Sequence, residues 1–225
     1  MKLALGGFLL LVAIRGSAQE SPVDIPRNEL PKSAHCIVCE ASGSAHGEEK
    51  PAAGVRFRGK EFYFCTSKEV AAFKRDPLSF MPPVLPRTAP LFRLKNLARE
   101  EIQIGDLKGR VVLVDFWATW CAPCVATMPE MQKLHVKYES KGLAVLGVSI
   151  DEDGEKKVKP FIARRNFTYP ILLDAGQTWK DYGVKAIPAL FLVDRSGRIV
   201  RQWSGKPDRK EVEKAVLEML AEQRS

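Results

Sequence analysis

The sequence predicts an α/β protein in which a small N-terminal module precedes a larger domain. Strand and helix patterns alternate through residues 91–225, which is typical of a layered α/β domain. Four prolines within residues 81–90 interrupt these patterns and separate a cysteine-bearing stretch from the larger domain. Hydrophobic residues make up 45% and charged residues 28% of the 225 positions, which excludes disordered, fibrous and polytopic membrane classes.

The elements of the larger domain follow from hydrophobic periodicity. Arg110–Trp117 is an almost continuous apolar run, as expected of a strand buried on both faces. After Pro123, apolar residues recur at steps of three and four and predict an amphipathic helix. The last helix is expected from Asp208, with Glu211 at capping-box spacing. The other predictions are strands at 143–150, 171–174, 189–194 and 199–203, the last one antiparallel, and a helix at 156–166.

The first eighteen residues are expected to be a cleaved signal peptide. Lys2 supplies a positive start, Leu3–Ile14 an apolar run of twelve residues, and Gly16–Ala18 small residues for cleavage. Twelve residues are too few to span a bilayer, although a short buried helix is the alternative. We therefore expect a periplasmic or other extracytoplasmic location, where disulfides persist.

The net charge of +8 points to no particular partner. The 35 basic and 27 acidic residues are spread along the chain, without a block of five or six like charges. No nucleic-acid-binding motif is present, so we expect no nucleic-acid partner.

The clearest chemical motif is Trp120-Cys121-Ala122-Pro123-Cys124, at a predicted strand-to-helix junction. Cys121 would lie at the helix N-terminus, where free N–H groups lower a thiol pKa and favour the attacking thiolate. Cys124, one turn later, would resolve the mixed disulfide. The alternatives are an inert disulfide or half of a zinc site, but no cysteine follows Cys124 to complete one.

Two longer motifs around this site can be compared with those of known protein families. They are Val114-Asp-Phe-Trp-Ala-Thr-Trp-Cys-Ala-Pro-Cys124, followed by Pro129, and Tyr182-Gly-Val-Lys-Ala-Ile-Pro-Ala-Leu-Phe-Leu-Val-Asp194. With them, residues 88–225 resemble the exported thioredoxin-like thiol–disulfide oxidoreductases of the TlpA/ResA family. The resemblance implies a thioredoxin fold, a central mixed sheet flanked by helices, with a strand–helix insert between Ile150 and Asp174.

The resemblance also implies roles for individual residues. Cys121 is expected to be the exposed nucleophile and Cys124 the buried resolving thiol, joined as the redox disulfide Cys121–Cys124. Ile187 and Pro188 are expected to form a cis peptide bond beside that disulfide and to offer backbone groups to the substrate. From the residues alone, a trans bond at Pro188 is equally acceptable. Trp120 is expected to contact the substrate.

One position departs from the family pattern. Many members carry a glutamate three residues after the second cysteine, where this chain has Thr127, which cannot carry a proton as a carboxylate does. Asp115 lies in the apolar strand six residues before Cys121, and burial would raise its pKa towards neutrality. We expect Asp115 to exchange a proton with Cys124. The alternative is a structural strand residue.

The module expected at residues 28–82 holds Cys36, Cys39 and Cys65, three thiols that cannot all pair within one chain. Cys36 and Cys39 have the spacing of half a zinc site, and His35 and His46 are near in sequence.

The run from Arg58 to Cys65, continuing to Pro77, resembles the YHS or TRASH-type treble-clef metal-binding module. The fourth cysteine of that pattern would fall at Glu69. Three thiolates with a carboxylate or histidine suit zinc, and thiolates also hold copper(I). The alternative is a structural disulfide, Cys36–Cys39 or Cys39–Cys65.

The predicted organisation is a signal peptide (1–18), the cysteine module (28–82), a proline-rich linker (83–90) and a thioredoxin-like domain (91–225). The predicted function is an exported reductase of client disulfides, such as those of apocytochrome c or metal-site cysteines. It needs no cofactor for the redox domain, and a membrane thiol donor would regenerate it. The alternative is a copper- or zinc-handling protein. A peroxidase is disfavoured, because the reactive cysteine lies in a Trp-Cys-x-Pro-Cys motif.

Overall fold

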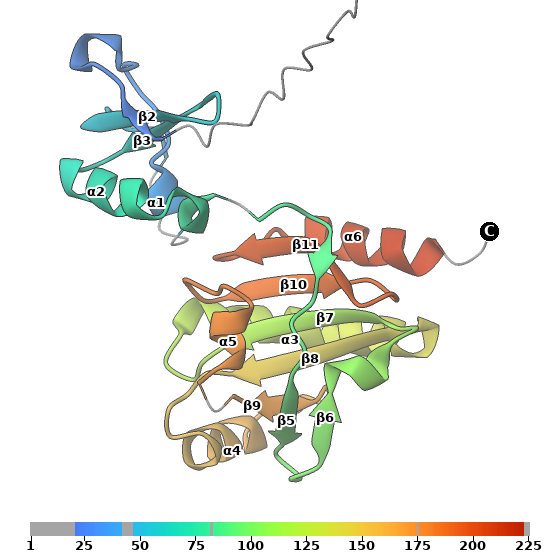
Figure 1. Ribbon diagram of the computed structural model, residues 1–225. Coiled ribbons are helices and arrows are strands. Elements are labelled where there is room, and N and C mark those ends of the chain that lie inside the picture. The colour runs from blue at the N-terminus through green and yellow to red at the C-terminus, as the bar shows by residue number, and fades with distance from the viewer. Residues whose placement is uncertain (1–20, 42–46, 82, 175, 223–225) are drawn as a thin grey trace, which may run out of the picture.

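The computed structural model describes residues 21–41, 47–81, 83–174 and 176–222. The predicted signal peptide lies outside these residues. The chain forms a small N-terminal module and a larger domain, with the module above the β4–β11 side of the larger sheet in Figure 1. No helix within the described ranges has the length and apolar character needed to cross a membrane.

The N-terminal module is a three-stranded antiparallel sheet with helices packed on it. Its strands are β1 (Val23–Asp24), β2 (Ala53–Phe57) and β3 (Lys60–Phe64), in the order β1-β2-β3, and its helices are α1 (Ile37–Ala41) and α2 (Ser67–Arg75). Arg58 and Gly59 join β2 to β3 with φ angles of 50° and 72°, as a tight hairpin turn requires. Phe73 of α2 is fully buried among the rings of Phe57, Phe62, Phe64 and Phe80, at centroid distances of 5.0–6.2 Å.

The larger domain is built on an eight-stranded mixed sheet in the order β4-β11-β10-β7-β8-β9-β5-β6. β7, β8 and β9 are parallel, and the remaining pairs are antiparallel. The strands are β4 (Arg87–Thr88), β5 (Arg93–Asn96), β6 (Glu101–Gln103), β7 (Val111–Trp117), β8 (Leu143–Ser149), β9 (Ile171–Leu173), β10 (Ala189–Val193) and β11 (Arg198–Ser204).

The sheet separates the hydrophobic core into two layers, and helices cover the sheet. The helices are α3 (Ala122–Tyr138), α4 (Glu155–Ala163), α5 (Thr178–Asp181) and α6 (Arg209–Ala221). Leu113 and Trp117 of β7 face the layer that contains residues of α3 and α6, whereas Val114 and Phe116 face the opposite layer with Tyr182. Because successive strand residues point to opposite faces, Asp115 lies on the α3 face.

The structure agrees with the predicted elements of the larger domain, with shifts of one to three residues at their ends. The insert between Ile150 and Asp174 is present as α4 and β9, which pairs in parallel with β8. The predicted capping box at Asp208 is not formed. Asp208 accepts the N–H of Lys210, but the Glu211 carboxylate accepts the Trp203 indole N–H at 2.9 Å instead.

Three strands of the larger domain were not predicted from hydrophobic periodicity. β4 lies within the proline-rich segment and pairs with β11, and the β5–β6 hairpin adds to the opposite side of the sheet beside β9. These strands are two to four residues long, too short to show a pattern of their own.

Candidate active site and cysteine cluster

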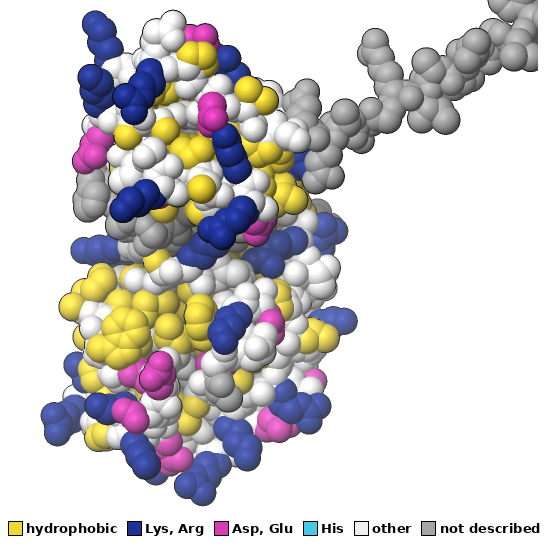
Figure 2. All heavy atoms as spheres, turned by 60° about the vertical axis from the view of Figure 1, so that its left-hand side comes forward, with side chains coloured by type: hydrophobic (Ala, Val, Ile, Leu, Met, Phe, Trp, Pro, Cys, Tyr) yellow, Lys and Arg dark blue, Asp and Glu magenta, His cyan; other side chains and the backbone are white. Residues whose placement is uncertain are grey.

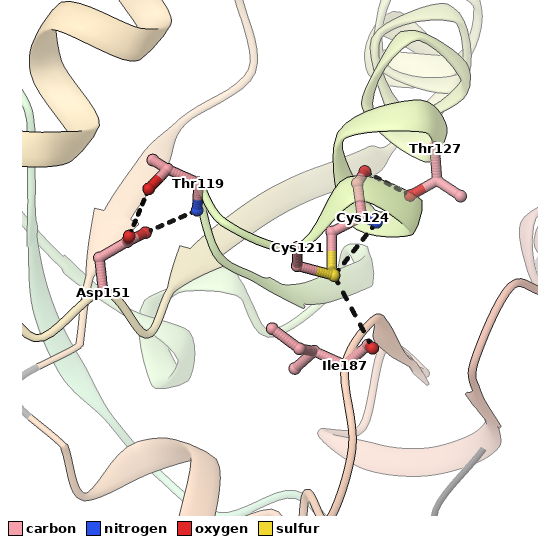
Figure 3. The surroundings of a disulfide bond; sticks show 6 residues. All are labelled: Thr119, Cys121, Cys124, Thr127, Asp151 and Ile187. Carbon is pink, nitrogen blue, oxygen red and sulfur yellow. Dashed lines mark hydrogen bonds between the residues drawn. A yellow bond between two sulfur atoms is a disulfide. The ribbon is translucent and has the colours of Figure 1, made fainter. Parts of the chain in front are cut away.

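The Cys121–Cys124 pair lies where β7 gives way to α3. Residues 118–120 connect the two elements, Cys121 is the N-cap of α3, and the two cysteines are joined in a disulfide (Figure 3). Pro123 stands in the first turn, where an N–H has no helical partner to lose. The predicted redox disulfide is therefore present in this structure.

The helix N-terminus polarises the Cys121 sulfur. The N–H of Cys124 donates to Cys121 Sγ at 3.2 Å, and the positive end of the helix dipole lies at the same place. In the reduced protein this arrangement favours a Cys121 thiolate. Cys121 has 6% of its surface exposed and Cys124 has none, so Cys121 is the more accessible sulfur, although less exposed than the resemblance implies.

The segment before β10 lies against this sulfur. The Ile187–Pro188 peptide bond is cis, as the resemblance implies, and the Ile187 carbonyl oxygen is 3.8 Å from Cys121 Sγ. Pro188 is buried, and its carbonyl accepts the Gly205 N–H at 2.9 Å. The backbone at Ile187 thus lies next to the disulfide.

Trp120, which directly precedes Cys121 in the chain, borders an open groove. It is 69% exposed, which is unusual for a tryptophan, and Trp179 lies along the same groove of about 790 Å³. Figure 2 shows hydrophobic side chains gathered on one face of the larger domain, below the N-terminal module. The acidic residues of the groove are Asp151, Glu152, Asp153 and Asp174, and its lysines are Lys157 and Lys180.

A buried carboxylate fixes the loop before Cys121. Asp151 is 4% exposed, and its carboxylate accepts the Thr119 N–H at 2.9 Å and the Thr119 hydroxyl at 2.6 Å (Figure 3). It also accepts the Ser149 hydroxyl at 2.8 Å. These bonds connect the ends of β7 and β8. The sequence analysis missed Asp151, because the residues lie 32 positions apart and no spacing rule relates them.

Asp115 is fully buried on the α3 face of β7. Among the described residues, neither of its carboxylate oxygens has a hydrogen-bond partner, and burial raises its pKa to about 7. The predicted shift towards neutrality is confirmed. An acid with this pKa can exchange a proton with a thiol under physiological conditions.

Tyr169 lies near Asp115 and was not expected at the site. Burial and the Asp115 charge raise the pKa of its hydroxyl, which has no hydrogen-bond partner among the described residues. Opposite Asp115 on β8 is Gly147, where an added Cβ would lie 2.9 Å from the Tyr169 ring and 3.3 Å from Trp117 Nε1. A glycine inside a buried strand is a sequence signal for such a close approach.

Thr127 binds the backbone of α3 through its hydroxyl. It is 7% exposed, and its hydroxyl donates to the Cys124 carbonyl oxygen at 2.8 Å. The departure from the family pattern therefore places a helix-bound hydroxyl, and no carboxylate, next to the resolving cysteine.

The three remaining cysteines meet in the N-terminal module and form no disulfide. The sulfur atoms of Cys36, Cys39 and Cys65 all lie within 4.8 Å of one another. Burial tends to raise the pKa of Cys36, but hydrogen bonds from the backbone of Cys39 and Cys65 outweigh it and the net direction is down. His35 contacts Glu48 at 3.8 Å, and His46 lies outside the described residues.

The fold and the dithiol together define a thioredoxin-fold thiol–disulfide oxidoreductase, and comparisons with known proteins agree. The larger domain is similar to a putative thiol:disulfide interchange protein DsbE from Chlorobium tepidum, with a TM-score of 0.58 and 34% sequence identity. The match covers 60% of this chain and 97% of that one.

A sequence model of the AhpC/TSA family matches residues 86–202, and the chain belongs to that family. It is 34% identical over 128 residues to the thiol-disulfide oxidoreductase ResA of Bacillus thuringiensis subsp. konkukian, covering 56% of this chain and 73% of that protein. It is 41% identical over 127 residues to the thioredoxin-like protein YneN of Bacillus subtilis, covering 56% and 74%. The family match begins at residue 86, so the N-terminal module lies outside it.

Proposed function

We propose that the protein is an exported reductase of disulfides in client proteins. The observation that carries this proposal is the position of Cys121, which caps α3 next to the Ile187 carbonyl and a groove with an exposed tryptophan. A client chain can lie in this groove with its disulfide presented to Cys121, while the backbone at Ile187 and Pro188 and the ring of Trp120 hold it. Client cysteines of apocytochrome c or of metal sites fit this chemistry.

The reaction is a two-electron exchange. The Cys121 thiolate attacks one client sulfur, breaking the client disulfide, forming a mixed disulfide and releasing a client thiolate. Cys124 passes its proton to ionised Asp115 and attacks Cys121 Sγ, which releases the second client thiolate. The client gains two electrons and the enzyme becomes the Cys121–Cys124 disulfide. A thiol donor at the membrane returns the electrons.

Insulin reduction with dithiothreitol tests the proposal. The parent should accelerate insulin precipitation, and Cys121→Ser should fall to the uncatalysed rate because it removes the attacking thiolate. Turnover retained by Cys121→Ser would exclude this mechanism. A potential of the dithiol near about −270 mV supports a reductant, whereas one near about −120 mV indicates an oxidant. Peroxide consumption by the reduced protein tests the peroxidase alternative.

Export is part of the same proposal. The positively charged start and the apolar run of residues 3–14 support it. N-terminal sequencing of the protein recovered from an expressing bacterium tests it. We expect a periplasmic protein that begins at Gln19, and a cytoplasmic protein that begins at Met1 would contradict export.

Metal handling is a second candidate function, favoured by the three thiols within 4.8 Å of one another. In that case the redox domain keeps the metal-ligand cysteines of a client reduced, and the module passes on its metal. Rapid transfer of bound metal to an apo-client distinguishes this function from a module with a resident ion.

A further inference from the structure

The N-terminal cysteines come from two places that the fold brings together. Cys36 and Cys39 lie at the start of α1. The backbone of Cys36 pairs with that of Tyr63 of β3 in an isolated β-bridge. Cys65 directly follows β3, 26 residues beyond Cys39. The hairpin end and the helix start thus carry all three sulfurs to one point.

The spacing of these sulfurs fits one metal ion. Four ligands arranged tetrahedrally around zinc, with Zn–S bonds of about 2.3 Å, place sulfur atoms about 3.8 Å apart. Cys39 Sγ and Cys65 Sγ are 3.7 Å apart. A disulfide would need about 2.05 Å between the same atoms.

Glu69 is the candidate for the fourth ligand, because its carboxylate lies next to Cys36, although outside the group of three sulfurs within 4.8 Å of one another. Its Oε2 atom is 3.9 Å from Cys36 Sγ, and it accepts the Thr66 N–H at 3.1 Å in the capping box of α2. The backbone bond holds the carboxylate beside the sulfurs, as outer hydrogen bonds commonly do for metal ligands. His35 contacts Glu48 at 3.8 Å, whereas Glu69 contacts Cys36 directly.

The donor set selects the metal. Soft thiolates exclude calcium and magnesium, which take oxygen ligands, whereas a carboxylate is a poor ligand for copper(I). Zinc accepts both sulfur and oxygen. The N–H of Cys65 donates to Cys36 Sγ at 3.4 Å, which offsets part of the negative charge that three thiolates and a carboxylate bring.

The module has a small core. Among its described residues, the cluster of buried apolar side chains has five members: Val55, Phe57, Phe62, Phe64 and Phe73. A unit of this size commonly depends on a metal or a disulfide, and metal binding then contributes to folding.

We propose that Cys36, Cys39, Cys65 and Glu69 bind one resident Zn²⁺ ion that stabilises the N-terminal module. The proposal is independent of the client-reduction function, because no residue of the site belongs to the redox dithiol or its groove.

Metal content of the full chain is the first test. The Cys121→Ser/Cys124→Ser protein, purified under reducing conditions, retains only the three thiols of the module. Elemental analysis should find one zinc per chain, and Cys65→Ser in the same background should remove it. No zinc, copper in its place, or a mass two protons lower with a Cys39–Cys65 disulfide would overturn the proposal.

Two variants separate the role of Glu69 in capping α2 from its proposed role as a metal ligand. Glu69→Gln keeps the box, since glutamine serves at this position, but loses the anionic ligand. Thr66→Ala loses the hydroxyl of the box and keeps the carboxylate. With Co²⁺ as the probe, Glu69→Gln should change the visible absorption of the bound ion and weaken Zn²⁺ binding at least about ten-fold. Thr66→Ala should keep the parent spectrum. A parent-like Co²⁺ spectrum in Glu69→Gln would remove Glu69 from the site.

Discussion

The chain contains the spacing Cys-x-x-Cys twice, in settings that give it different chemistry. Cys121 and Cys124 start α3, a helix of 17 residues, at the end of a fully buried strand. Cys36 and Cys39 flank the start of α1, a helix of five residues, in a module with a small core. The first pair forms a disulfide, and the second pair meets a third sulfur.

The surroundings of the two pairs explain the difference. The sulfur of Cys121 accepts a hydrogen bond from the backbone N–H of Cys124 in the same motif. The sulfur of Cys36 accepts one from the N–H of Cys65, 29 residues away. A buried acid, Asp115, lies on the α3 face of β7, the strand that leads to the first pair, and a half-buried Glu69 contacts the second. Spacing therefore provides two thiols close together, and the neighbouring groups distinguish the redox dithiol from the proposed zinc site.

The largest difference between the two motifs is expected when the second cysteine of each is replaced. Cys124→Ser should lose most insulin turnover and accumulate mixed disulfides through Cys121, because no second thiol of the enzyme remains to release the client. Cys39→Ser, the matched change in the other motif, should keep activity within about two-fold, since its thiol is remote from the dithiol. Non-reducing gels and the insulin assay measure both. Equal losses in the two variants would mean that the two motifs act together.

Asp115→Asn should slow turnover by about ten- to a thousand-fold. The amide cannot accept the Cys124 proton, and proton transfer of this kind contributes about 10²–10⁴ to rate. The rate of the parent should fall below pH 7, as Asp115 becomes protonated, and this inflection should be absent from the variant. Single-turnover reduction across pH 6–9 checks it. A variant as fast as the parent would make Asp115 structural.

Asp115 should also make the free energy of unfolding depend on pH. The folded-state pKa of about 7 exceeds the ordinary value of 3.8, so Asp115 holds a proton in the folded state that the unfolded state has released. The part of its burial cost that depends on ionisation is therefore absent below about pH 4. It then destabilises the fold by about 1.4 kcal/mol per pH unit up to pH 7, about 4 kcal/mol in all. Asp115→Asn should gain stability over the parent as pH rises from 4 to 8. Urea unfolding of both oxidised proteins measures this, and a constant difference would contradict the buried titration.

Phe73→Ala tests whether the two regions are independent. The ring is fully buried among four aromatic neighbours, so its loss should destabilise the module by about 3–5 kcal/mol. Hydrogen exchange should rise in β2 and β3 while insulin reduction stays unchanged. Leu78→Ala, a 51% exposed position in the same module, is the control. A loss of reductase activity in Phe73→Ala would show that the module supports the active site.

The smallest effect is expected at Asp151, which holds the loop before Cys121. Asp151→Ala leaves the half-buried Thr119 N–H without its acceptor and should lower kcat/KM for insulin by about three- to ten-fold. Glu218→Ala, an exposed acid on α6 outside the groove, should have no effect. Steady-state kinetics of both variants compare them. Equal activity of the parent and Asp151→Ala would limit Asp151 to a structural role.

Much of the larger domain could be predicted because its signals are local. Val111–Trp117 is apolar at nearly every position, and the helix after Pro123 has a clear period. Asp115 was found as the one carboxylate in that strand. The short strands β4, β5 and β6 could not be found in this way, because their pairing depends on partners far along the chain.

The sequence by itself determined which groups can react: a dithiol at a strand-to-helix junction, an acid in an apolar strand and three leftover thiols. Only the tertiary structure decided what surrounds them. It placed Asp151 on Thr119, Tyr169 near Asp115 and Glu69 against Cys36. The physical reason is range, since backbone periodicity acts over a few residues whereas these contacts join segments about 30 to 50 residues apart through packing of the core.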